Sequence, residues 1–104
     1  MPRPADPIAV DPYVVDTLLP DLVGHDRRPS AFLVYLVLWR RTEAGRAAAA
    51  LSLRDLAEAT GLSKRAVQSA VNALVRRRLV ALERETATSV PSYVVLRPWA
   101  RRTS

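Results

Sequence analysis

The chain has 104 residues, of which 49% are apolar and 25% are charged, and its formal net charge is +6. This length and composition predict one globular domain. The chain has no cysteine, which excludes a disulfide framework, a catalytic thiol and a thiolate metal site, and its single histidine excludes a histidine-rich metal cluster. Three glycines are too few for a glycine-rich phosphate loop.

The charged residues are unevenly distributed along the chain. Residues 1–26 carry one cation and five aspartates at five-residue intervals, a net charge of −4, whereas residues 27–104 carry fifteen cations and five anions, a net charge of +10. A basic body indicates a polyanionic partner, nucleic acid first and an anionic membrane surface second. The five-residue spacing of the aspartates matches neither the helix nor the strand period and offers no preformed metal cage, so we expect no metal and no cofactor.

The longest unbroken apolar run, residues 31–39, has nine residues, whereas a membrane-spanning helix needs about 20. The first residues contain no apolar stretch of the secretory kind. We therefore expect a cytoplasmic protein without a membrane segment.

The N-terminal third is expected to consist of a flexible N-terminus, residues 1–10, and a helical extension, residues 11–29. Asp11 and Pro12 form a typical helix start, as N-cap and first helical residue. Pro20 should end the helix that they open, because the residue before a proline is disfavoured in a helix.

A strongly apolar helix is expected to begin at Ser30, as its N-cap, and to continue to about residue 42. Phe32, Tyr35 and Trp39 form a helical stripe on it, typical of a core. Because this helix is apolar on nearly all sides, it needs cover from the N-terminal helix or from a second protomer. This need favours a homodimer that forms through the N-terminal helix and the helix over 30–42.

Two shorter helices are expected to follow. Gly45 suits the break after the apolar helix, and residues 47–51 are compatible with either a helix or a short extended segment. Ser52 and Asp55 have the spacing of a capping box that opens a helix over 53–60. Gly61 can take the left-handed conformation of a tight interhelical turn, and Ser63 is expected to cap a helix from Lys64 to about Arg77.

The hydrophobic period changes after this helix. Residues 79–85 and 92–97 are rich in β-branched and apolar residues and predict a β-hairpin with a polar loop over 86–91. Residues 99–104 are expected to be a basic, frayed tail.

The helix that begins at Lys64 has two distinct faces when it is wound at about 100° per residue. Its apolar face holds Val67, Ala70, Val71, Leu74 and Val75. Its opposite face holds Arg65, Gln68, Ser69, Asn72 and Arg76, without a carboxylate. These side-chain types read base edges, since arginine pairs with guanine, glutamine or asparagine with adenine, and serine with either.

The stretch LRDLAEATGLSKRAVQSAVNALVRRRLV, residues 53–80, resembles bacterial winged helix-turn-helix DNA-binding proteins. Among these are the MarR-like and GntR-like regulators and the winged helices of phage and plasmid replication initiators. The resemblance implies a mainly α fold with a small β-hairpin wing, over residues 30–98, and a recognition helix in the major groove of double-stranded DNA.

The resulting expectation divides the interface into two sets of residues. Base contacts are expected from Arg65, Gln68, Ser69 and Asn72. Phosphate contacts are expected from Arg54, Ser63, Lys64, Arg76, Arg84 and Arg97.

The chain departs from the family pattern at two places. Arg78 stands where a glycine is common before the wing, so we expect this corner to be built without a left-handed residue. The loop over 86–91 has no arginine or lysine, so the wing should reach phosphates through hydroxyls, Arg84 or Arg97, or engage DNA only weakly.

A small transcription regulator that binds specific DNA sequences is the expected function. A winged-helix module of a replication-initiation or nucleoprotein-assembly complex and a protein-binding winged helix are the alternatives. An enzyme is not favoured, because the chain shows no paired carboxylates, nucleophile–base set or phosphate loop.

Overall fold

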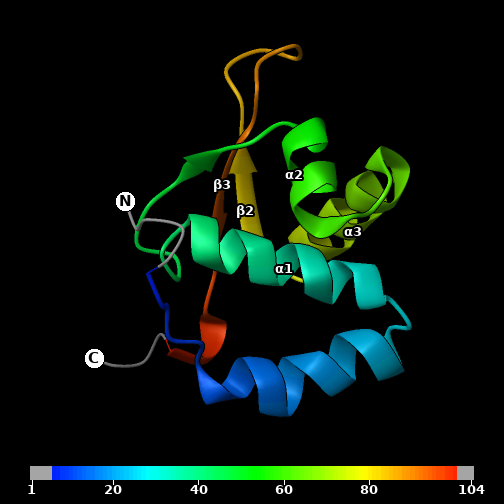
Figure 1. Cartoon of the computed structure of the whole chain (residues 1–104), viewed down its shortest axis with the longest axis vertical. Coiled ribbons are helices and arrows are strands. Elements are labelled where there is room, and N and C mark those ends of the chain that lie inside the picture. Colours follow the sequence, from blue (N-terminus) through cyan, green and yellow to red (C-terminus); the bar gives the residue numbers. More distant parts are fainter. Residues whose placement is uncertain (1–5, 101–104) are drawn as a thin grey trace.

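Helix α1 (Pro29–Arg41) runs through the centre of the fold, as Figure 1 shows, with the N-terminal helical segment along one side of it and α2 and α3 on the other. The computed structural model describes residues 6–100. The other elements are η1 (Val14–Leu18), η2 (Pro20–His25), β1 (Ala49–Ala50), α2 (Leu53–Thr60), α3 (Lys64–Arg76), β2 (Val80–Glu83), β3 (Ser92–Val95) and η3 (Pro98–Ala100). The predicted mainly α fold with a β-hairpin wing is confirmed. No helix within residues 6–100 is both long and apolar enough to span a bilayer.

The N-terminal helix does not end at Pro20, so that prediction is wrong. The helical path continues from η1 into η2 through wide turns bonded over five residues: the Leu19 N–H donates to the Val14 carbonyl, and the Asp26 N–H donates to the Asp21 carbonyl at 2.9 Å. In an α-helix a proline removes one hydrogen bond and crowds the carbonyl four residues before it. Wider turns relieve that crowding.

The cover of α1 comes from the chain itself. Val14, Leu18 and Leu22 are buried in the same core as α1, so the N-terminal helix provides the cover that the apolar helix required. Residues 11–29 are therefore part of the single core and not an extension beside it. The predicted core role of Phe32, Tyr35 and Trp39 is confirmed, since all three are buried.

The segment before η1 is docked, which corrects the expected flexible N-terminus over the part that the structure describes, residues 6–10. The Trp39 Nε1 donates to the Ala9 carbonyl at 2.8 Å, and Ile8 packs against the core. Residues 1–5 of that prediction lie outside the described residues.

Asp11 connects the two ends of the described chain. Its Oδ2 accepts from Arg97 Nε at 2.9 Å and from Trp99 Nε1 at 3.0 Å, and the Trp99 ring stacks on Tyr13 with 4.5 Å between centroids. The carboxylate is thus used across the fold and not as the helix cap that the sequence predicted. The expectation of a frayed tail is wrong for Trp99 and Ala100, and residues 101–104 lie outside the described residues.

The start and end of α1 differ from the predicted pattern. Its N-cap is Arg28 and its first residue is Pro29, so Ser30 is not the cap; proline at this position has no N–H that a cap must satisfy. After Thr42 the chain turns through three left-handed residues, which end at Gly45 with φ +92°. A Cβ on Gly45 would lie 2.7 Å from the Val95 carbonyl oxygen, so this close approach to β3 requires glycine.

The sheet is antiparallel, with strand order β1-β3-β2. Ala49 pairs with Tyr93, so the ambiguous stretch 47–51 contributes a short strand. In the hairpin, Val80 pairs with Val95 and Glu83 pairs with Ser92, which makes both strands shorter than predicted. The hairpin projects away from the helices (Figure 1).

Candidate nucleic-acid interface

The turn between α2 and α3 has the predicted local geometry. The Ser52 hydroxyl accepts from the Asp55 N–H at 3.0 Å, and the Ser52 N–H donates to the Asp55 carboxylate at 2.8 Å, which lowers the pKa of Asp55. Helix α2 ends at Gly61 in the left-handed conformation, with φ +81°. The Ser63 hydroxyl then caps α3 by accepting from the Ala66 N–H at 3.0 Å.

Helix α3 is rotated slightly from its predicted orientation. Val67, Ala70, Val71 and Leu74 are buried as expected, but Val75 is 42% exposed and Ala73 is buried at 3%. At about 100° per residue, Ala73 and Val75 lie on opposite flanks of the Val67 stripe. The prediction for Val75 is therefore wrong, because tertiary packing turns the Ala73 flank of α3 toward the interior. Val75 thereby adds an apolar group, of the kind that contacts a thymine methyl, to the edge of the exposed face.

The four predicted base-contacting residues Arg65, Gln68, Ser69 and Asn72 are all exposed on one face of α3. Gln68 Nε2 donates to Asn72 Oδ1 at 3.0 Å, so the two amides form a coupled pair one turn apart. Ser69 Oγ accepts from Arg28 Nη1 at 3.1 Å. No part of the described chain covers Arg65, Gln68 or Asn72, so this face is accessible to a ligand.

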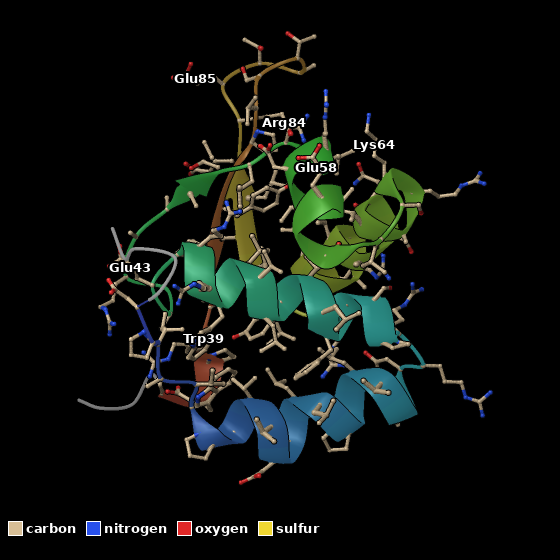
Figure 2. All side chains as sticks on the ribbon, in the orientation of Figure 1. Trp39, Glu43, Glu58, Lys64, Arg84 and Glu85 are labelled. Atoms are coloured by element: carbon tan, nitrogen blue, oxygen red, sulfur yellow. The ribbon has the colours of Figure 1, made fainter. Side chains whose placement is uncertain are left out.

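The predicted phosphate contacts on the two helices are also exposed. Lys64 projects from the first turn of α3 (Figure 2), and Arg76 is exposed in its last turn. Arg54 lies on α2, where its Nε contacts Glu58 Oε2 at 3.1 Å. This pair is widely exposed, and exposed i,i+4 pairs are weak, so Arg54 can exchange Glu58 for a phosphate at little cost.

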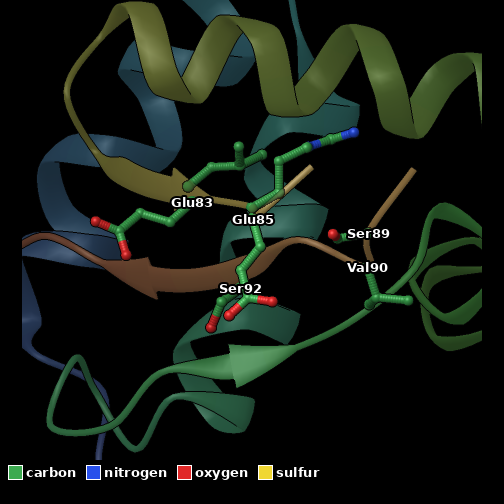
Figure 3. A pocket seen from close by; sticks show the side chains of 7 residues that line it. Glu83, Glu85, Ser89, Val90 and Ser92 are labelled. Atoms are coloured by element: carbon green, nitrogen blue, oxygen red, sulfur yellow. The ribbon is translucent and has the colours of Figure 1, made fainter. Parts of the chain in front are cut away.

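The wing is a poor electrostatic partner for DNA, in agreement with the absence of cations from residues 86–91. Arg84 lies in sequence between Glu83 and Glu85, and its Nη1 donates to the Ala87 carbonyl at 3.2 Å. The hydroxyls of Thr86 and Ser89 bond each other at 2.8 Å. A shallow pocket at the base of the wing, shown in Figure 3, is lined by Leu82, Glu83, Arg84, Glu85, Ser89, Val90 and Ser92.

Arg97 lies apart from this surface. Its Nη2 contacts Asp11 Oδ2 at 2.8 Å, and its guanidinium carbon lies 5.7 Å from the centroid of the Trp39 ring. These contacts use the guanidinium to join the ends of the described chain, so we do not include Arg97 in the proposed interface.

The end of α3 is held by the acidic N-terminal segment. Arg77 Nη2 donates to Asp21 Oδ2 at 2.6 Å, and Arg77 Nη1 donates to Asp26, and these bonds raise the pKa of Arg77. The pKa of Asp26 is lowered, first by its hydrogen bond with His25 and then by Arg77. Asp21 and Asp26 lie on one side of the segment, because both carboxylates contact the same Arg77 guanidinium.

Asp21, His25 and Asp26 also lie close enough together, within 4.8 Å, to offer ligands to a metal ion. The Arg77 guanidinium already supplies a positive charge to both carboxylates. We therefore assign these aspartates to the support of α3.

The corner between α3 and the wing contradicts the sequence-based expectation. Arg78 has φ +59° and is left-handed. The Arg78 N–H donates to the Val75 carbonyl at 3.0 Å and the Leu79 N–H donates to the Leu74 carbonyl at 2.9 Å, the two bonds of a Schellman motif. These bonds satisfy carbonyls at the end of α3, which offsets the cost of a left-handed arginine.

Arg28 also lies at this surface, although the sequence does not predict it. It precedes α1 and is 41 positions before Ser69, so no local pattern indicates that the two side chains meet.

Comparison with known families agrees with this geometry. The family model described as a helix-turn-helix domain matches residues 28–80, just over half of the chain, from the start of α1 to the start of β2. Comparisons with curated proteins and with solved structures give no match. A helix-turn-helix domain suggests DNA binding. The chain therefore belongs to the helix-turn-helix domain family.

Proposed function

We propose that this protein binds specific sequences of double-stranded DNA by placing α3 in the major groove. The observation that carries the proposal is the accessible face of α3, on which Arg65, Gln68 and Asn72 are exposed. Base edges in the major groove present donor and acceptor patterns that these side chains can distinguish. Lys64 and Arg76 flank this set and are suited to phosphates.

The charge distribution of the folded chain supports the same proposal. The acidic N-terminal segment directs Asp21 and Asp26 toward Arg77, and Asp11 toward Arg97. Within residues 6–100 these aspartates are therefore paired with cations other than those on the exposed face of α3. That face keeps its positive charge, which attracts DNA and makes binding dependent on salt.

We propose further that the biological role is transcription regulation by a binding module that is not an enzyme, and that two copies act together. One short recognition helix reads few base pairs, and a dimer would read two half-sites about 34 Å apart. Apolar side chains remain exposed on the N-terminal segment and α1, the elements through which we expect the copies to associate. These residues are Val15, Val23 and Leu33. Light scattering across a concentration series tests the dimer, and a monomer at high concentration would refute it.

Selection of bound duplexes from random DNA tests the function directly. The expected result is an enriched sequence whose affinity falls steeply with salt concentration, since each neutralised phosphate adds about 0.9 to the slope of log K against log salt. Equal binding to all duplexes would refute sequence specificity, and no binding at low salt would refute the proposed function. The position of the enriched sequences, in promoters or at replication origins, separates a regulator from a replication module.

A further inference from the structure

Arg28 is held beside the exposed face of α3 although it belongs to another part of the fold. Its Nη1 donates to Ser69 Oγ at 3.1 Å. Its backbone is anchored on both sides, because the Arg28 N–H donates to the Leu22 carbonyl at 2.8 Å and the Arg28 carbonyl accepts from the Ala31 N–H at 3.0 Å. The Arg28 side chain is therefore attached to a fixed backbone position at the beginning of α1. Helix α1 lies beside α3 in Figure 1.

The Arg28 guanidinium has more N–H donors than its bond to Ser69 uses. It carries five N–H groups, and the bond to Ser69 uses one of them. No carboxylate pairs with Arg28 among residues 6–100, unlike Arg77 and Arg97, which are both neutralised by aspartates. A planar set of free donors on a cation matches the oxygens of a phosphate.

Ser69 lies at the edge of the exposed face, not at its centre. It precedes the buried Ala73 by four residues, so both lie on the flank of α3 that turns toward the interior. Arg65 and Asn72 lie farther from that flank. The Ser69 hydroxyl is thus placed to hold Arg28, and it is less well placed to reach a base.

We propose that Arg28 binds a backbone phosphate of DNA beside the base-reading residues, and that Ser69 is a positioning residue for Arg28. This inference rests on the proposed function and changes the expected role of Ser69 from base contact to support. It also extends the interface from the two helices of the motif to the turn before α1.

The test measures DNA affinity for the variants Arg28→Ala, Ser69→Ala and Arg28→Ala/Ser69→Ala at several salt concentrations. Arg46→Ala is the matched control, because Arg46 is exposed beyond the other end of α1, about 20 Å of helix away, and its loss changes the net charge equally. Each variant is measured on the selected duplex and on duplexes with single base changes. Thermal unfolding followed by circular dichroism verifies that each variant folds.

Arg28→Ala should weaken binding to all duplexes by roughly tenfold and reduce the salt slope by about 0.9, whereas Arg46→Ala should change neither. Ser69→Ala should cause a smaller, sequence-independent loss, and it should cause no further loss when Arg28 is already alanine. Ser69→Thr, which keeps the hydroxyl, should restore binding.

Three outcomes would overturn the inference. One is an Arg28→Ala variant that behaves like Arg46→Ala; another is a Ser69→Ala variant that relaxes the preference at one base pair and adds fully to Arg28→Ala. In both cases the wild-type chain still binds DNA, so the proposed function stands. A wild-type chain that binds no duplex overturns the proposed function and this inference together.

Discussion

Arg77, at the end of α3, donates to Asp21, a residue 56 positions earlier in the chain, across 2.6 Å. Asp26 accepts from the other arm of the same guanidinium. The acidic N-terminal segment thus holds the helix that we propose to read DNA, and it does so outside the region that matches the helix-turn-helix family, residues 28–80. The fold and the orientation of α3 therefore depend on the segment before the motif.

Replacing Asp26 with asparagine should reduce stability in a pH-dependent manner. We expect the free energy of unfolding to fall by about 1 kcal/mol near neutral pH, the scale of a partly exposed ion pair. Because the pKa of Asp26 is lowered in the folded state, its contribution is present above the unfolded pKa and is lost as the pH falls below about 4. Urea unfolding should show that Asp26→Asn is less stable than the wild type at pH 7 and that the two are equally stable at pH 3.

The control for this prediction is Asp16→Asn, which removes an exposed member of the same aspartate series. It should leave stability almost unchanged at both pH values. An Asp26→Asn effect that is as large at pH 3 as at pH 7 would contradict the assignment to the ionised carboxylate.

Arg65 and Asn72 are expected to carry base recognition. Alanine at either position should weaken binding to the selected duplex by about 1–3 kcal/mol and relax the preference at one position of the site. Arg76→Ala should instead weaken binding to every duplex alike, since phosphates carry no sequence information. Fluorescence anisotropy with a panel of single-base variants of the duplex distinguishes the two patterns, and unchanged preference in both alanine variants would refute the assignment of the face.

The wing should contribute little to affinity. The Arg84 side chain donates to Ala87 within the hairpin and has a glutamate on each side in sequence. Arg84→Ala is therefore expected to lower DNA affinity less than Arg76→Ala in the same assay, and the salt slope should change less. An equal loss from both variants would show that the wing reaches a phosphate.

The left-handed Arg78 offers a site for stabilisation. Glycine takes positive φ without the clash of a Cβ, so Arg78→Gly should raise the free energy of unfolding by about 1 kcal/mol. Arg78→Ala serves as the control, because it removes the charge and retains the Cβ. If alanine stabilises the chain as much as glycine, charge and not backbone conformation is responsible.

Replacing Gly45 and Gly24 with alanine should change the stability of the chain in opposite directions. Gly45→Ala should destabilise the chain by roughly 2 kcal/mol or more, because the new Cβ would meet the Val95 carbonyl and φ is +92°. Gly24 lies in a helical turn with open space around its Cβ position, so Gly24→Ala should stabilise by up to about 1 kcal/mol. Thermal unfolding of the two variants beside the wild type measures both effects.

The sequence alone determined the features that depend on neighbours three or four residues apart. Ser52 and Asp55 predict their own capping box, Gly61 predicts the left-handed turn, and the apolar period of α3 predicts which face is buried, apart from the Ala73 and Val75 flanks. These features follow from side-chain spacing and backbone conformation within one or two helical turns.

Contacts between distant residues depend on the assembled fold. Arg28 reaches Ser69, Arg77 reaches Asp21 and Trp99 stacks on Tyr13, and in each pair the partners are separated by more than 40 residues. The same packing turned α3 toward its Ala73 flank. Local propensities could not predict these outcomes, because each is stabilised by contacts that form only when the whole core is assembled.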